Sequence, residues 1–194
     1  MIGILNYDTK GAAQISEILK CLNSQSKIIF NEYDLLQCDK IILPDGEFLG
    51  LSIRKLQFTN LYNALKVIQK PMLGINLGMF LLCEEVVDYN LFGLCTFPMK
   101  IKRLKHFSNV DLFDCNCTII HSQNTKLLSN IGEDEILKFY NKFFIESNEY
   151  TTSYILIDSL KIATSIRKDN VYGVQFRIEN NNAGLQLLKN FIEI

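Results

Sequence analysis

Apolar residues along the first half of the chain follow two alternating patterns. Short, nearly continuous apolar runs predict buried strands over residues 2–5, 27–30, 39–44 and 71–75. Between these runs, apolar residues recur at helical spacing and predict helices over residues 11–22, 51–68 and 77–87. Strands that alternate with helices indicate a parallel sheet covered by helices on both faces.

The pattern changes after about residue 93, where apolar runs follow one another without helices between them. The strands expected there are residues 99–104, 117–120, 143–145, 154–157, 161–166 and 171–176. Antiparallel strands added to the main sheet fit this pattern, and so does a small second sheet. A final helix over residues 183–192 follows Asn180, Asn181 and Asn182, any of which can cap it.

We therefore expect one α/β domain over residues 1–194, built on a doubly wound, mostly parallel sheet with added antiparallel strands. In such a sheet the functional site lies at the carboxyl ends of the strands. A chain of this length is sufficient for one full-sized core.

The composition and net charge of the chain argue against several classes of function. The formal net charge of −1 argues against a nucleic-acid binder, which usually carries a large basic excess. No apolar run approaches the ~20 residues that cross a membrane, and the N-terminus lacks the order of a signal peptide. We expect a cytoplasmic protein whose six cysteines are reduced. The spacing of Cys115 and Cys117 is too short for a zinc knuckle, and we predict no metal and no cofactor.

The segment around Asn76 carries the most informative pattern. An apolar strand enters a Gly-x-Asn-x-Gly turn, formed by Gly74, Asn76 and Gly78, and an apolar helix leaves it. This is the layout of a nucleophile elbow, whose tip normally carries the reacting side chain. An amide cannot attack a carbonyl, yet Asn tolerates the positive φ that the tip requires. The two glycines permit the tight crossing of strand and helix.

Stretches in three parts of the chain point to one family. They are residues 1–7, residues 41–44 with 73–79, and residues 173–179 with 184–191. Together they resemble the glutaminase subunits of imidazole glycerol phosphate synthases, which are class I glutamine amidotransferases. The resemblance covers nearly the whole chain. It is specific in the elbow and the C-terminal block and loose over residues 95–145.

The resemblance implies a Cys-His-Glu triad that hydrolyses glutamine through a thioester. The nucleophile position is Asn76 and the base position is Arg177, so neither essential group is present. A guanidinium stays protonated and cannot serve as a general base. The carboxylate position, Glu179, is retained, while Ile178 replaces the family's proline. The resemblance therefore implies an enzyme frame without its reacting groups.

The loop that helps to form the oxyanion hole in the family is altered as well. It corresponds to residues 44–48, is one residue short, and contains Asp45, Gly46 and Glu47. Negative charge at this place opposes an oxyanion. We expect Arg177 to pair with Glu179, Glu146 or Glu47 instead, which would close the former pocket with an ion pair.

No other residue is expected to restore catalysis. Cys83 lies two helical turns, about 10 Å, beyond the elbow if the predicted helix is continuous. His121 and Ser122 are adjacent in a predicted strand, so their side chains face opposite sides. His106 and His121 are read as surface or loop histidines.

Three functions follow, and we favour the first. The chain is a catalytically silent homologue that forms a heterodimer with a (β/α)8-barrel cyclase or synthase subunit and stabilises or regulates it. Alternatively, it is an active subunit that supplies ammonia to histidine or surface-sugar biosynthesis. The third hypothesis is a stand-alone small-molecule binding protein on the same fold. Glutamate release from glutamine separates the first two, and co-purification separates the first from the third.

Overall fold

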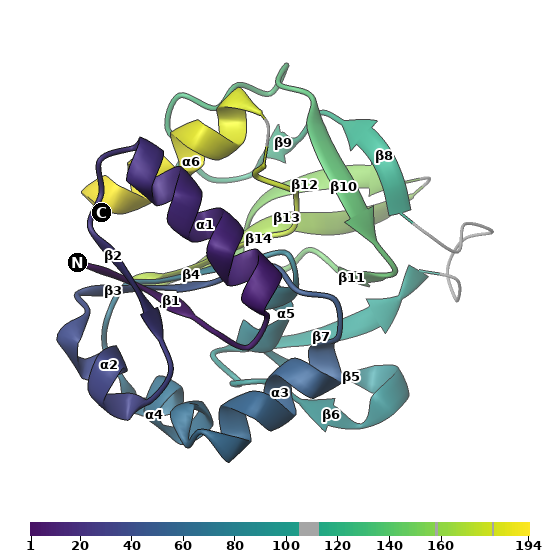
Figure 1. Ribbon diagram of the computed structural model, residues 1–194. Coiled ribbons are helices and arrows are strands. Elements are labelled where there is room, and N and C mark those ends of the chain that lie inside the picture. The colour runs from purple at the N-terminus through teal and green to yellow at the C-terminus, as the bar shows by residue number, and fades with distance from the viewer. Residues whose placement is uncertain (105–112, 158, 180) are drawn as a thin grey trace.

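The computed structural model describes residues 1–104, 113–157, 159–179 and 181–194, and an eight-stranded sheet forms its centre (Figure 1). In spatial order the strands are β2 (Ser26–Ile29), β1 (Ile2–Leu5), β3 (Lys40–Leu43), β4 (Met72–Ile75), β14 (Val171–Val174), β13 (Leu160–Lys168), β12 (Thr151–Ile157) and β9 (Ile120–His121). The strands from β2 to β14 pair in parallel, and β13, β12 and β9 extend the sheet in antiparallel fashion. The predicted fold class is confirmed.

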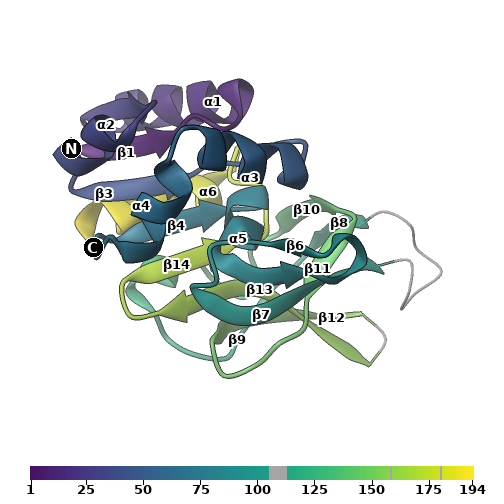
Figure 2. The same cartoon turned by 90° about the horizontal axis from the view of Figure 1, so that it is seen from below.

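Helices cover both faces of the parallel part, as Figures 1 and 2 show. The helices are α1 (Thr9–Cys21), α2 (Glu32–Gln37), α3 (Leu49–Phe58), α4 (Leu61–Val67), α5 (Leu77–Leu82) and α6 (Asn182–Glu193). Apolar residues of α1 and α6 share one buried cluster with one face of the sheet. Those of α2, α3, α4 and α5 belong to the cluster on the other face. None of the helices in the described residues is long and apolar enough to cross a membrane.

Two smaller sheets hold the remaining strands of the described residues. A four-stranded sheet contains, in order, β11 (Phe143–Ile145), β7 (Phe97–Arg103), β5 (Cys83–Val86) and β6 (Leu91–Phe92). A two-stranded ribbon pairs β10 (Leu137–Asn141) with β8 (Phe113–Cys117). Short 3₁₀ turns occur at η1 (Val87–Tyr89) and η3 (Lys126–Leu128). Both placements expected for the late strands therefore occur in this fold.

Three predicted elements were wrong in detail. The helix expected over residues 51–68 is two helices, because Asn60 adopts a left-handed conformation with φ 58°. The helix expected over residues 77–87 ends at Leu82, and the next residues form β5. The strand expected over residues 117–120 is the end of β8 and the start of β9. Residues 77–83 are buried throughout, so their periodicity cannot separate a helix from a strand.

The last helix provides a test of local stability. Asn181 caps α6 by accepting a hydrogen bond from the Gly184 backbone N–H, and its side-chain nitrogen donates to the Arg177 carbonyl at 2.8 Å. Asn181→Ala should lower the free energy of unfolding by about 1 kcal/mol, because the cap is lost. Asn182→Ala is the matched control at an exposed helical position. Urea denaturation measures both, and equal losses would contradict a capping role for Asn181.

Candidate functional site

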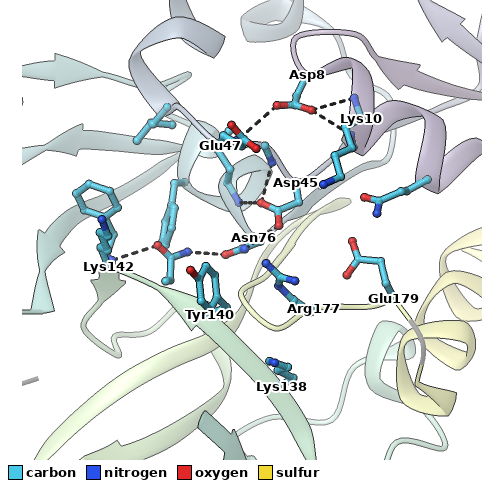
Figure 3. Close-up of a pocket in the computed structure, with 18 of the residues that line it drawn as sticks. Asp8, Lys10, Asp45, Glu47, Asn76, Lys138, Tyr140, Lys142, Arg177 and Glu179 are labelled. Atoms are coloured by element: carbon cyan, nitrogen blue, oxygen red, sulfur yellow. Dashed lines mark hydrogen bonds between the residues drawn. The ribbon is translucent and has the colours of Figure 1, made fainter. Parts of the chain in front are cut away.

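The carboxyl ends of the parallel strands open onto a cavity of about 870 Å³ (Figure 3). The chain passes from β1 into α1, from β3 into α3, and from β4 into α5 at this edge. Charged side chains of both signs line the cavity, and they are Asp8, Lys10, Asp45, Glu47, Lys138, Lys142, Arg177 and Glu179. The site expected at this edge of the sheet therefore coincides with a real cavity.

Asn76 lies at the tip of the turn between β4 and α5, in the conformation that the elbow requires. Its φ is 48° and its ψ is −106°, and its backbone N–H donates to the Val174 carbonyl at 2.7 Å. The side chain is only 5% exposed. A Cβ at Gly74 would lie 2.5 Å from the Gly78 carbonyl oxygen, so the crossing of strand and helix depends on glycine there.

Both polar ends of the Asn76 side chain are hydrogen bonded. Its nitrogen donates to Asp45 Oδ2 at 2.9 Å, and its oxygen accepts from Asn141 Nδ2 at 2.5 Å. Asp45 Oδ1 accepts from the Leu77 backbone N–H at 3.2 Å and from the Gly46 N–H at 2.7 Å. The N–H of the residue after the tip is an oxyanion donor in enzymes with this elbow. Here that N–H is occupied by a carboxylate of the chain itself.

The loop that carries Asp45 is held from both sides. The Tyr7 hydroxyl donates to the Pro44 carbonyl, and burial, together with the charges of Asp45 and Asp8, raises the pKa of Tyr7 well above its usual range. Asp8 caps α1 and also accepts from the Glu47 N–H at 3.3 Å. The protonated Tyr7 hydroxyl and the Asp8 carboxylate therefore hold the loop so that the Asp45 carboxylate stays against the elbow.

Arg177 projects into the same cavity from the segment after β14 (Figure 3). Its backbone N–H donates to the Lys138 carbonyl at 2.9 Å, and its guanidinium carbon lies 4.8 Å from the centre of the Tyr140 ring. The buried Nε finds no hydrogen-bond partner among the described residues. Tyr140 therefore positions the guanidinium at the wall of the cavity.

The ion pair expected for Arg177 does not form, so the prediction of a closed, salt-bridged pocket was wrong. No ion pair of Arg177 occurs among the described residues. Glu146 pairs with Lys102 at 2.9 Å instead, because it follows β11, which is hydrogen bonded to β7. Glu179 and Glu47 line the cavity without reaching the guanidinium.

Six residues singled out from the sequence thus lie at one cavity, namely Asp45, Gly46, Glu47, Asn76, Arg177 and Glu179. Sequence reasoning missed its far wall, which β10 builds. Leu137 and Phe139 are fully buried, while Lys138 and Tyr140 alternate with them and line the cavity. That alternation is the signal of a half-buried strand and was available in the sequence.

The residues rejected as substitutes for the triad lie elsewhere. Cys83 is not on a helix but in β5, where burial raises the pKa of its thiol and disfavours the thiolate. His121 lines a separate cavity of about 420 Å³, and the Ser122 hydroxyl donates to the Thr151 carbonyl at 2.7 Å. His106 lies outside the described residues. No cluster of three or more potential metal ligands occurs in the part of the chain that the structure describes.

Comparison with known proteins places the chain in a family. The model of the SNO glutamine amidotransferase family matches residues 8–193. The chain belongs to this family. Its relatives include the imidazole glycerol phosphate synthase subunit HisH of Listeria innocua, with 31% identity over 100% of this chain and 96% of the relative. The HisH subunit of Bacteroides thetaiotaomicron is 27% identical over 100% of this chain and 99% of the relative.

Solved structures agree with this glutamine amidotransferase assignment at the level of the fold. A crystal structure of a glutamine amidotransferase gives a TM-score of 0.73 at 16% identity, covering 99% of this chain and 97% of that one. The structure of PurLQS from Thermotoga maritima gives 0.71 at 14% identity, with 99% and 97% covered. The family resemblance inferred from the elbow and the C-terminal block is confirmed.

Proposed function

We propose that this glutamine amidotransferase homologue does not hydrolyse glutamine and acts as a structural or regulatory subunit. Its partner is a (β/α)8-barrel cyclase or synthase subunit, with which it forms a cytoplasmic heterodimer. Residues 1–194 serve as one domain in this assembly.

The contact between Asp45 and the elbow supports this proposal most strongly. An enzyme of this type needs a nucleophile, a base and free donors for the oxyanion. Asn76 has no nucleophilic atom, and Arg177 cannot accept a proton. Asp45 Oδ1 accepts a hydrogen bond from the Leu77 N–H at 3.2 Å, so this N–H is not free to bind an oxyanion. The negative charge of Asp45 also lies where the oxyanion would develop. The three defects lie in three separate segments, so no single residue explains the loss.

The relatives support the choice of partner, because their names describe them as subunits of imidazole glycerol phosphate synthase. The chain retains the fold and the elbow although it lacks the nucleophile and the base. The surfaces that surround the cavity are therefore retained as well. Phe48 lies on this rim, next to the lining residue Glu47, and is 61% exposed. We propose that this rim faces the barrel subunit.

The first test measures glutamate released from glutamine by the purified chain, alone and with its barrel partner. Release should stay at the level of a blank without protein, because the nucleophile and the base are both absent. The HisH subunit of Listeria innocua, assayed with its own synthase partner, serves as the positive control. Clear turnover by the wild-type chain would overturn the proposal in favour of an active, ammonia-supplying subunit.

The second test is co-purification of the tagged chain from its native cells. A barrel-type subunit should be recovered, and its identity decides between histidine and surface-sugar biosynthesis. Phe48→Glu should reduce the recovery by roughly tenfold or more, since it places a charge at an apolar contact. Phe58→Glu is the matched control, because Phe58 is 90% exposed at the far end of the same helix. A solitary monomer would favour the stand-alone binding protein instead.

A further inference from the structure

Arg177 is a cation without an anion in a cavity of substantial size. The residue is half-buried, its Nε is enclosed without a hydrogen-bond partner, and no carboxylate of the described residues pairs with it. A buried polar group that lacks a partner is destabilising unless a water or a ligand satisfies it. The guanidinium therefore lines the cavity without an ion-pair partner among the described residues.

The wall around Arg177 has a defined geometry rather than a loose surface. Two hydrogen bonds hold the backbone of Arg177. Its N–H donates to the Lys138 carbonyl at 2.9 Å, and its carbonyl accepts from Asn181 Nδ2 at 2.8 Å. The Tyr140 ring orients the guanidinium, and Figure 3 shows Arg177 between Tyr140 and Glu179. Because Lys138 and Tyr140 alternate along β10 with fully buried residues, the register of this strand directs both toward the cavity.

Two of the four carboxylates that line the cavity accept hydrogen bonds from the chain itself. Asp8 accepts from three backbone N–H groups, and Asp45 accepts from two backbone N–H groups and from Asn76. These two carboxylates are therefore already satisfied by hydrogen bonds. The cations Lys10, Lys138 and Lys142 line the cavity together with Arg177. An anion that enters the cavity can therefore approach Arg177 without displacing a paired carboxylate of the described residues.

We propose that this cavity binds a small anion through a carboxylate or phosphate group, with Arg177 as the anchoring residue. The planar fork of an arginine binds two oxygens of such a group at once, which a lysine cannot do. The inference rests on the proposed function, because it requires that the elbow is not a hydrolytic site. It adds that the base position of the family has become a ligand-binding position.

The test titrates the isolated, isotope-labelled chain with inorganic phosphate and, separately, with malonate at constant ionic strength. Heteronuclear NMR follows the Arg177 Nε–H signal, which the Arg177→Met spectrum assigns. At least one anion should shift this signal saturably at low-millimolar concentration. Saturation by phosphate alone identifies a phosphate ligand, and saturation by malonate alone identifies a carboxylate ligand. Either result supports the proposal.

Variants of Arg177 and of a lysine outside the cavity distinguish specific anion binding at Arg177 from a general attraction of anions to positive charge. In the variants, binding is followed by the backbone N–H signal of the lining residue Asn141, which all of them retain. Arg177→Met should weaken binding by at least about tenfold, and Arg177→Lys should weaken it as well, because the fork is lost. Lys189→Met removes one positive charge from the exposed face of α6, outside the cavity, and should bind as the wild type does. The proposal is overturned if neither anion saturates the signal, or if Arg177→Met binds as tightly as the wild type. Neither result affects the glutaminase and co-purification tests, which use glutamine and the partner.

Discussion

Asn76→Cys should leave glutamine hydrolysis at background, although it restores the nucleophile of the family. The new thiol would face a guanidinium at position 177 instead of an imidazole, so nothing would accept its proton. The Leu77 N–H would still be held by Asp45, and the oxyanion would meet a carboxylate. In enzymes with such triads, losing one essential member reduces turnover by about as much as losing all of them, on the order of a millionfold.

The measurement is glutamate release by the variant, with and without its barrel partner, after circular dichroism has confirmed that it is folded. Arg177→His made alone is the matched control, since it restores the base and leaves the nucleophile absent. Both single variants should be indistinguishable from the wild type. Turnover by Asn76→Cys within a hundredfold of the Listeria innocua relative would mean that a residue other than Arg177 serves as the base.

Gly78→Ala should cause the largest loss of stability among single substitutions at the elbow. A Cβ at Gly78 would lie 2.0 Å from the Leu43 carbonyl oxygen, where α5 crosses the end of β3. This contact is with backbone that is fixed in the sheet, so it cannot be relieved by a rotamer change. Overpacking of this kind destabilises by on the order of 3 kcal/mol. At roughly 2–4 °C per kcal/mol for a domain of this size, the unfolding midpoint should fall by roughly 6–12 °C.

Gly50→Ala provides the comparison for this substitution. Gly50 lies in α3, and its Cβ would approach only the end of the Leu91 side chain, at 3.3 Å. Alanine is the better helix former by about 1 kcal/mol, so this variant should be as stable as the wild type or slightly more so. Differential scanning calorimetry of both variants is the measurement. A Gly78→Ala midpoint equal to that of Gly50→Ala would show that α5 can move away from β3.

The sequence allowed the parallel half of the fold to be predicted, because most of its strands are short, largely apolar runs that alternate with helices. The elbow was predictable as well, because Gly74 and Gly78 flank a turn between an apolar strand and an apolar helix. The end of α5 was not predictable. Residues 77–83 are buried throughout, so their polarity carries no period, and the helix ends where β5 begins to pair with β7 and β6.

The site was predictable wherever a residue stands at the end of a parallel strand. Asp45, Asn76 and Arg177 follow β3, β4 and β14, so the topology alone brings them together. The partner of Arg177 was predicted incorrectly because it depends on a strand from outside the main sheet. Tyr140 reaches the guanidinium from β10, and nothing local to Arg177 in the sequence indicates that contact.

The hydrogen bonds of Asn76 have an evolutionary consequence. They join the loop after β3, the turn after β4 and the last residue of β10 through one buried amide. A cysteine at this position would remove both bonds and leave Asp45 and Asn141 without that partner. A change of Asn76 toward the nucleophile of the family is therefore expected to lower the free energy of unfolding. Selection for folding would then act to retain the amide, independently of any effect on catalysis.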